Sequence, residues 1–571
     1  GPQGTLFGRN TSAGVVSINT AGAEFDPRAY AELSVGNYDM VSGSAMVTGG
    51  FNDKVAGRFD VKYRERDGYI EDVNSDRSFN SLDRYLMRGQ LLYEDAGTTF
   101  RLIADYAETD EQCCVAINAI SGPTAPAVNA AAARLGLTGI ATADLEDRKV
   151  AVSPNRDFGE AIEEYGISGE LKSELFGANF TSITSYRDWE AIRNQDVDFS
   201  GIDRAYRDGT TIGDRVFTQE VRLQDRVGPL DWLVGAYYLN EDMGYKDTIR
   251  IGSQGDLYTD LLAFGVTGGQ LFGSLDPSGT MVPSLLGNVD PVTGMPVAPG
   301  TPGSVPFFIP STPEGSGEND NFKVKTEAVA LFTHNEIDLS DKLTLTLGGR
   351  LNYETKDLDY TIDSQIPGCD LFAAVPGVVQ SLGSLALLVC NPLVNNEFNG
   401  SDSDSFSDSA FSGTAKLAYD ITPDAMIYGA ISRGYKSGGY NLDRSGFDSV
   451  LFGGDGAQTD DLRFDAETLD SYEIGWKTSF DGWSSTLNGA LYFQNVSDFQ
   501  QNFFVESNFR TVNADIESYG LELDASASPV AGLILQGGYA YTKAEYKEDV
   551  TVPGSDGSPL LLTAGGVQIA N

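Results

Sequence analysis

The sequence has little positive charge and almost no histidine. Lys and Arg total 39 against 82 Asp and Glu, which gives a formal net charge of −43. Nucleic-acid binding needs a basic face, so no nucleic-acid partner is expected. The acidic balance suits either solubility in a salty medium or a surface that meets cations. The only histidine is His334 and no G-x-S-x-G elbow occurs, so histidine-based catalysis is disfavoured and no enzyme is predicted.

Long apolar runs are also missing. No stretch of about 18 uninterrupted apolar residues occurs, and the nearest one, 371–389, is broken by Pro376, Gln380 and Gly383. We therefore expect no helical membrane span. A bilayer crossing without helices must be a closed barrel, because hydrocarbon offers no partner to an unpaired backbone group. No signal peptide precedes Gly1, so the chain is expected to begin within a domain.

Cysteine is scarce, with four residues at two places. Cys369 and Cys390 bracket the apolar stretch, and in an oxidising compartment they would close a loop as a disulfide. The adjacent Cys113 and Cys114 could bond to each other, pair elsewhere or stay reduced. Metal binding by this pair is the weaker option, because no further Cys or His lies nearby.

Glycine, aromatic residues and period-two alternation are abundant. The chain has 65 glycines and 11% aromatic residues, as transmembrane barrels with tight turns and aromatic girdles require. In 343–354, Leu and Tyr side chains share one face, while Arg350, Asn352 and Glu354 share the other. A soluble β-sandwich would alternate too, but its packed core would not accept these charges, whereas a wet lumen would.

The alternation predicts an all-β protein with about 17 antiparallel strands. We expect strands at 29–37, 41–51, 54–66, 82–94, 97–107, 162–176, 178–190, 213–225, 230–243, 324–338, 342–356, 411–420, 424–435, 467–479, 484–497, 511–525 and 532–545. Tight turns follow the even-numbered strands. Long connections follow odd-numbered strands, at 108–160, 191–212, 244–322, 357–410 and 436–466. All long loops should therefore share one end of a transmembrane antiparallel β-barrel.

The opening residues carry a specific signature, Pro2-Gln3-Gly4-Thr5-Leu6-Phe7-Gly8-Arg9-Asn10-Thr11. This motif resembles the end of the plug domain of TonB-dependent outer-membrane receptors. The segments 184–189, 218–223, 432–441 and 471–477 also resemble barrel segments of the iron-complex branch of that family. The resemblance implies that 1–27 is the end of a plug and 28–571 an incomplete barrel. Such receptors close with 22 strands, so we expect a fragment without most of the plug and the last strands.

The resemblance also implies a function at the outer membrane of a Gram-negative cell. Family members import a scarce, bulky nutrient, most often a ferric siderophore, and are driven by the TonB energy-coupling protein. Glycan, cobalamin or another metal chelate remain open as small-molecule ligands. No coupling box occurs in the sequence, and the histidine and sequence signals of haem receptors are missing. The alternatives are a non-energised structural or diffusion barrel, and a soluble adhesin-like β protein. Outer-membrane lipid is an expected partner.

Several residues follow as candidates from this resemblance. Family members hold the plug to the barrel by arginine–glutamate pairs, which makes Arg9 the plug arginine, Glu473 its expected partner and Glu220 the second choice. Glu473 could instead be a solvated carboxylate of the lumen. Ligand contacts are expected at the end of a strand that enters a long loop; these are Arg433, Tyr435, Lys436 and Tyr440, unless they belong to an aromatic girdle.

Two acidic groups resemble loose arrays of oxygen ligands. They are Asp196, Asp198 and Asp203, and Asp402, Asp404 and Asp408. Neither has the spacing of an EF-hand. Calcium in these external loops is possible, although solvated loop charge explains them as well. No resident cofactor is predicted.

Overall fold

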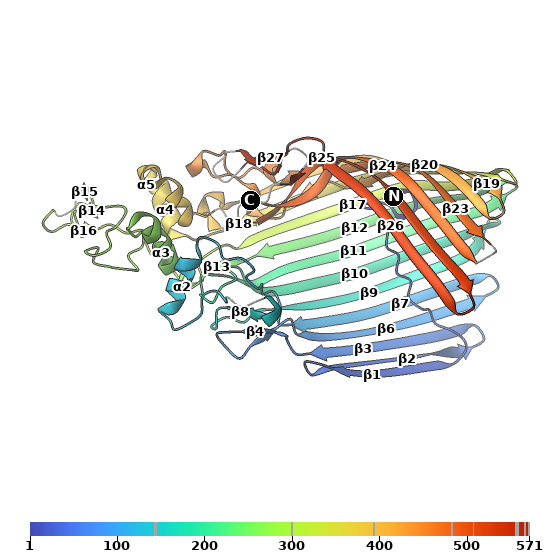
Figure 1. Cartoon of the computed structure of the whole chain (residues 1–571), viewed down its shortest axis with the longest axis horizontal. Coiled ribbons are helices and arrows are strands. Elements are labelled where there is room, and N and C mark those ends of the chain that lie inside the picture. The colour runs from blue at the N-terminus through green and yellow to red at the C-terminus, as the bar shows by residue number, and fades with distance from the viewer. Residues whose placement is uncertain are drawn as a thin grey trace.

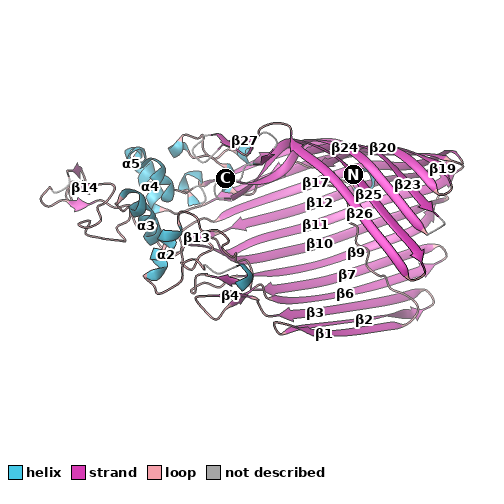
Figure 2. Cartoon of the chain, viewed as in Figure 1, coloured by secondary structure: helices cyan, strands magenta, loops and turns pink. Residues whose placement is uncertain are grey.

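The computed structural model describes residues 1–141, 145–298, 301–391, 394–480, 484–505, 508–553, 559–564 and 567–568. One antiparallel sheet of 18 strands dominates it (Figures 1 and 2). Its strands are β1 (Arg28–Gly36), β2 (Met40–Asn52), β3 (Val55–Arg66), β6 (Leu82–Asp95), β7 (Thr98–Glu111), β9 (Gly159–Leu175), β10 (Ala178–Asp196), β11 (Ala205–Val227), β12 (Leu230–Asp247), β13 (Ile249–Ile251), β17 (Asp320–Ser340), β18 (Leu343–Ile362), β19 (Gly400–Thr422), β20 (Ala425–Lys436), β23 (Glu467–Phe480), β24 (Ser485–Val505), β25 (Asn508–Val530) and β26 (Leu533–Tyr546).

The remaining elements are short and lie in the connections and the opening residues. The helices are α1 (Gly4–Phe7), α2 (Ala125–Ala133), α3 (Gly255–Thr267), α4 (Pro367–Ala374) and α5 (Pro376–Leu382). Short 3-10 turns occur at Leu145–Asp147, Gly383–Leu388, Asn396–Phe398, Arg444–Gly446, Val450–Phe452 and Thr459–Leu462. The minor strands are β4 (Ile70–Asp72), β5 (Ser78–Phe79), β8 (Lys149–Val150), β14 (Asn288–Val289), β15 (Pro296–Val297), β16 (Val305–Pro306), β21 (Gly439–Tyr440), β22 (Arg463–Phe464), β27 (Thr551–Pro553), β28 (Pro559–Leu561), β29 (Thr563–Ala564) and β30 (Val567–Gln568).

Each long strand pairs with the next long strand along the chain, so the sheet is an up-and-down meander. The sheet curves around its own interior (Figure 1). Within the described ranges, β1 pairs only with β2 and β26 only with β25, and these strands are its two edges. Every one of the predicted strands is present, and the predicted antiparallel barrel fold is confirmed.

Tight turns gather at one end of the strands and long connections at the other. Ala96 and Gly97 have φ values of 48° and 82°, and Phe176 and Gly177 have 55° and 83°, as the two-residue turns of twisted hairpins require. The predicted turn at 481–482 lies outside the described residues. The opposite end carries α2 to α5 (Figure 2). This arrangement confirms the predicted rhythm of turns and loops.

The strands next to the long loops are longer than predicted. β19 begins at Gly400 rather than at 411, and β18 continues to Ile362, which pairs with Gly400. Residues 400–410 are mostly Asp, Ser and Gly, which have low strand propensity, so their sequence reads as a loop. The hydrogen bonds to β18 nevertheless hold them in the sheet. The connection 436–466 needs no such correction, because β20 ends at Lys436 and β23 begins at Glu467.

The two faces of the sheet differ in polarity. Arg350 and Glu354 on β18 are each 3% exposed, whereas Leu351 between them is 63% exposed. Along β17 the outer side chains change from polar at 321–327 to apolar at Val329 and Leu331. Charged residues inside and exposed apolar residues outside are the reverse of a soluble protein and are typical of a membrane barrel.

The long loops have hydrophobic cores of their own. One core surrounds Cys369, Phe372 and Cys390 and includes Ala263 of α3. Another stacks aromatic side chains of β17 and β18, such as Phe322 and Tyr360, against Phe447. No single helix of the described ranges has the length and hydropathy of a membrane span, while the bent pair at 367–374 and 377–388, with 104° between its parts, meets both criteria together.

Candidate functional site

Residues 1–12, the opening segment, lie against the inner face of the sheet. Helix α1 packs on β17, β18, β19 and β20. The chain then reverses at Gly8, whose φ is +86°. A Cβ at Gly8 would lie 3.2 Å from Nη2 of Arg350, so the backbone conformation and the close approach both favour glycine.

Arg9 joins the opening segment to two strands of the sheet. Its Nη1 donates to Oε2 of Glu354 on β18 at 2.7 Å, and its Nη2 lies 3.2 Å from Oε2 of Glu241 on β12. Burial alone would lower the pKa of Arg9, but the two carboxylates outweigh burial and the net shift is upward. The guanidinium is therefore held charged between two anions.

The predicted partners of Arg9 were wrong, although an arginine–glutamate contact does form. Glu473 on β23 accepts a hydrogen bond from Oη of Tyr428 at 2.5 Å, and Glu220 on β11 pairs with Arg222 at 2.7 Å. All these glutamates are on inner-face positions of their strands. Alternation fixes the face of a side chain but not its height along the barrel, and only Glu354 and Glu241 stand at the height of Arg9.

Further polar contacts hold the opening segment along the end of β20. The backbone N–H of Asn10 donates to the carbonyl of Tyr435 at 3.0 Å, and Oδ1 of Asn10 accepts from the N–H of Ser437 at 3.1 Å. Ser12 donates to Oε1 of Glu467 at 2.6 Å. The Ser437 hydroxyl also contacts Glu354. The segment is thus docked mainly by hydrogen bonds and ion pairs, which water can replace.

Two predicted ligand residues lie at the end of the sheet that carries the long loops, which we call the mouth. Both form hydrogen bonds with aspartates of β19. Tyr435 donates to Asp408 at 3.1 Å, and Tyr440 donates to Asp404 at 2.9 Å. Both tyrosines are buried. Burial and the hydrogen bond to Asp404 raise the pKa of the Tyr440 phenol, so it remains a hydrogen-bond donor at neutral pH.

The other two predicted ligand residues are placed differently. Arg433 forms a bidentate pair with Asp470, with both N–O distances 2.6 Å. The Arg433 side chain is 49% exposed and is held by Asp470, whereas Tyr435 and Tyr440 are buried, so Arg433 is the weakest candidate for a role at the mouth. Lys436 is the last residue of β20 and is half-buried.

A buried ion pair fixes the loop between β20 and β23 over the mouth. Arg444 is 1% exposed, and its Nε lies 2.6 Å from Oδ2 of Asp320 and 3.2 Å from Oε2 of Glu318. Its Nη1 donates to Oγ of Ser364 and to the carbonyl of Asn395, at 2.6 Å and 3.1 Å. One side chain therefore links this loop to β17 and to both ends of the connection between β18 and β19.

The aspartates predicted as calcium ligands have partners within the protein. Asp198 accepts the N–H groups of Arg204 and Ala205, and Asp203 forms a bidentate pair with Arg156. Asp404 and Asp408 accept from the tyrosines named above, and Asp402 is exposed. Calcium binding stays a prediction.

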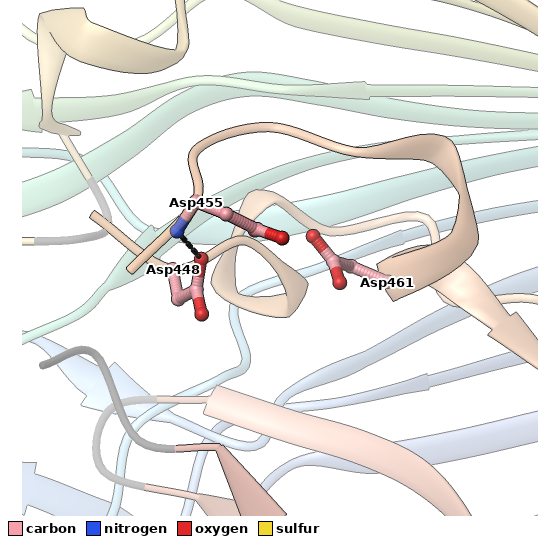
Figure 3. Close-up of side chains that lie close together, drawn as sticks. All are labelled: Asp448, Asp455 and Asp461. Atoms are coloured by element: carbon pink, nitrogen blue, oxygen red, sulfur yellow. Dashed lines mark hydrogen bonds between the residues drawn. The ribbon is translucent and has the colours of Figure 1, made fainter. Parts of the chain in front are cut away.

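A different acidic trio comes together in the loop between β20 and β23. Carboxylate oxygens of Asp448, Asp455 and Asp461 lie within 4.8 Å of one another (Figure 3). The N–H of Asp455 donates to Oδ1 of Asp448 at 2.8 Å. Burial and the neighbouring carboxylates raise the pKa of Asp461 to about 6. The three carboxylates therefore disfavour one another's charged forms.

The cysteines form two disulfides. Cys369 bonds to Cys390, as predicted, and Cys113 bonds to Cys114, which was one of the options left open. The first bond closes the loop that carries α4 and α5. The second joins neighbours and closes no loop of comparable length.

Sequence reasoning missed the residues that receive the opening segment. Glu354, Glu241 and Glu467 come from three separate strands, Ser437 directly follows β20, and the four share no local motif. Alternation does identify the carboxylates that face the interior, where Arg9 also lies. Too many carboxylates share that face, however, for the sequence to indicate which of them bind Arg9.

Comparison with known proteins gives a family match. A model of the family described as TonB dependent receptor-like, beta-barrel, matches residues 142–564. The matched region covers β9 to β26 and all but the first of the long connections that were predicted.

Three solved structures of similar fold are described as receptors for a siderophore or a ferric complex. The ferric yersiniabactin uptake receptor FyuA from Yersinia pestis aligns with a TM-score of 0.65 and 16% identity over 96% of this chain and 66% of its own. The siderophore receptor PiuA from Acinetobacter baumannii gives 0.63 and 14%, over 98% and 70%. The ferric-catecholate import receptor Fiu from E. coli K12 gives 0.59 and 14%, over 98% and 70%. The chain thus spans 66% to 70% of the length of these structures.

Proposed function

Because the chain belongs to the TonB-dependent receptor family, we propose that the protein takes part in TonB-dependent import of a scarce, bulky nutrient across the outer membrane. A ferric siderophore is the proposed substrate class. Three structures of similar fold are described as receptors for ferric yersiniabactin, a siderophore and ferric catecholates. Their sequence identities to this chain are 14% to 16%, so the likeness shows the fold, and the substrate class is our proposal.

The observation that carries this proposal is the docking of the opening segment inside the curved sheet. Arg9 reaches Glu354 and Glu241, and Asn10 and Ser12 add hydrogen bonds to other strands. Contacts of this kind are specific in geometry, yet water can replace each of them. An energy-coupling partner that pulls on a plug would therefore be able to displace the segment and open a path.

The exposed apolar face supports outer-membrane lipid as the surrounding medium. On β17, β18, β20 and β23, four apolar side chains are largely exposed; Leu331, Leu351, Ile431 and Ile474 are 67%, 63%, 58% and 68% exposed. In water this band would be a strong aggregation surface, whereas in lipid it is the required surface. We propose ligand contacts at Tyr435, Lys436 and Tyr440 near the mouth, and keep Arg433 as the weakest member of the predicted set.

Uptake by the full-length receptor in a deletion strain tests the proposal. The cells receive a radio-iron ferric catecholate or a ferric hydroxamate as the only iron source. We expect accumulation above the vector control with at least one of them, and loss of it in a strain without TonB. Energy-dependent uptake of cobalamin or a glycan, with no iron uptake, would leave the transport mechanism intact but change the substrate.

The competing function is a structural or diffusion barrel without energy input. It predicts solute entry that continues in the TonB-deficient strain and after an uncoupler is added. That result would contradict the proposed function. Extraction of the protein without detergent would contradict both membrane functions and favour a soluble β protein.

A further inference from the structure

Arg350 is a buried arginine with an incomplete set of partners. Its side chain is 3% exposed on the inner face of β18. Its Nε donates to Oδ1 of Asn352 at 2.8 Å, while its buried Nη1 has no hydrogen-bond partner. The guanidinium lies 5.3 Å from the ring centre of Tyr237 and 5.1 Å from that of Phe332, which compensates only part of the lost hydration.

Three other deeply placed arginines show how this chain can treat such a charge. Arg444 has two carboxylates, Arg9 has two, and Arg207 is bidentate with Asp247. No carboxylate lies within 4 Å of the Arg350 guanidinium among the described residues. Glu220, whose charge acts on Arg350 from farther away, is paired with Arg222 at 2.7 Å. A buried cation without a directly paired anion is costly, so its retention points to a partner that is not part of the sheet.

Further unpaired polar atoms surround Arg350. Because Asn352 gives its oxygen to Arg350, its Nδ2 is left buried without an acceptor. Ser412, the cross-strand neighbour of Arg350 on β19, is 1% exposed, and its hydroxyl has no partner. Arg350 and Asn352 thus offer N–H donors, and Ser412 a hydroxyl, to one position on the inner face. An anionic group with several acceptor oxygens would give all three side chains the hydrogen-bond partners that they lack.

The opening segment covers this position. A Cβ on Gly8 would approach Nη2 of Arg350 to 3.2 Å, and one on Gly4 would approach Oγ of Ser412 to 2.9 Å. Glycine at both positions lets the backbone lie directly on these groups. Movement of the segment would therefore uncover the donors at the moment when a path through the interior opens.

We propose that Arg350, Asn352 and Ser412 form a binding site for a carboxylate or a comparable planar anionic oxygen group of an acidic, oxygen-rich small molecule, and that the opening segment covers this site until it moves. The fork of a guanidinium matches two anionic oxygens in one plane. The ligand would bind there after it has passed the mouth, at an intermediate site along the path through the interior. This inference rests on the proposed import function and names the charge class of the substrate.

Arginine-specific labelling tests the site without any need for transport. Full-length receptor in detergent is treated with phenylglyoxal, and modification of each arginine is followed by peptide mass spectrometry. Wild type is compared with the Arg9→Gln/Asn10→Ala variant, which loses the contacts of the segment with Glu354, Glu241 and Ser437. Exposed Arg433 and buried Arg444 are internal controls. We expect Arg350 to be labelled at least about fivefold faster in the variant.

The probes are 2,3-dihydroxybenzoate and its neutral amide, which differ in one carboxylate. The acid should slow labelling of Arg350 in the variant at least about fivefold, and the amide should not. Asn352→Leu in the same background should reduce this protection while Arg350 remains reactive.

Four labelling outcomes overturn the inference. Equal effects of the two probes would remove the anionic preference, and no protection would remove the site. If Arg350 in the variant stays as unreactive as Arg444, or is as reactive as Arg433 in wild type, the segment does not act as its cover. An absence of uptake with intact protection would contradict the proposed function and leave the site standing.

Discussion

Arg9 and Glu354 are 345 positions apart in the sequence, and Nη1 of the first donates to Oε2 of the second at 2.7 Å. Glu354 is 3% exposed and also receives contacts from Ser437 and, at 3.5 Å, from Lys356. One inner-face carboxylate therefore holds the opening segment, the end of β20 and its own strand together.

Glu354→Gln should loosen the opening segment. The charge partner of Arg9 would be lost on one side, while Glu241 would remain, so we expect a cost of about 1–3 kcal/mol for docking of the segment. Hydrogen exchange of residues 1–12 should accelerate correspondingly. Glu473→Gln is the matched control, because Glu473 bonds to Tyr428 rather than to Arg9. Equal acceleration in both variants would contradict the assignment.

Gly8→Ala should weaken the same docking for a different reason. The φ of +86° and the approach to Arg350 both disfavour a Cβ, and we expect a loss of about 1–3 kcal/mol. The measurement is the rate at which a protease cuts within the opening segment. Gly22→Ala is the control, since a Cβ there meets nothing within 4 Å. An unchanged rate in Gly8→Ala would show that the backbone relaxes freely.

Arg444→Met should release the loop between β20 and β23. Removal of one partner from a buried ion pair leaves Asp320 and Glu318 without a cation, at a cost of about 3–5 kcal/mol. Arg433→Met also removes a bidentate arginine, but Arg433 is half exposed and its loss should cost at most about 1 kcal/mol. Hydrogen exchange across 437–466 distinguishes the two. Similar exchange in both variants would refute the structural role of Arg444.

The same loop should be more stable in mild acid than at neutral pH. Burial, with a further contribution from Asp247, raises the pKa of Asp443 from 3.8 to about 6. A raised pKa means that the folded loop binds the proton more tightly than the unfolded loop. The stabilisation is therefore complete below pH 3.8 and is lost as the pH rises through about 6.

Exchange protection of 437–466 at pH 5 and pH 7.5, corrected for intrinsic rates, measures this effect. We expect greater protection at the lower pH, by about 1–3 kcal/mol. Asp443→Asn can still accept the N–H of Ser445, which Asp443 binds at 2.7 Å, but it does not titrate, so its pH dependence should be smaller. A wild-type loop that is less stable at pH 5 would reverse the predicted sign.

The two disulfides should differ in their effect when removed. Cys369 and Cys390 are separated by 21 positions, and a closed loop of that length stabilises by about 3 kcal/mol. Cys113 and Cys114 are separated by 1 and restrain almost no chain entropy. Paired serine variants, compared by proteolysis of 370–389 and 108–120, check this. Equal susceptibility of the two regions would contradict the loop-closure explanation.

The sequence predicts the middle of each strand better than its end. Alternation identifies the inner face at Arg350 and the outer face at Leu351, because lipid and lumen impose opposite polarity on neighbouring residues. At Gly400, by contrast, Asp and Ser have low strand propensity, and only pairing with β18 makes the segment a strand. Partnerships such as Arg9 with Glu354 depend on the relative height of distant strands, which no local pattern encodes.

The outer side chains of β17 give the proposed receptor a particular profile above the bilayer. Side chains from Asn321 to Glu327 are polar on the outside, and the apolar band begins only at Val329. At about 3.3 Å per residue and a tilt of about 40°, this wet part of the wall rises roughly 20 Å. On this side the rim of the proposed receptor would stand clear of the headgroups, and an arriving solute would meet the polar side chains of Asn321, Lys323, Lys325 and Glu327 before it meets lipid.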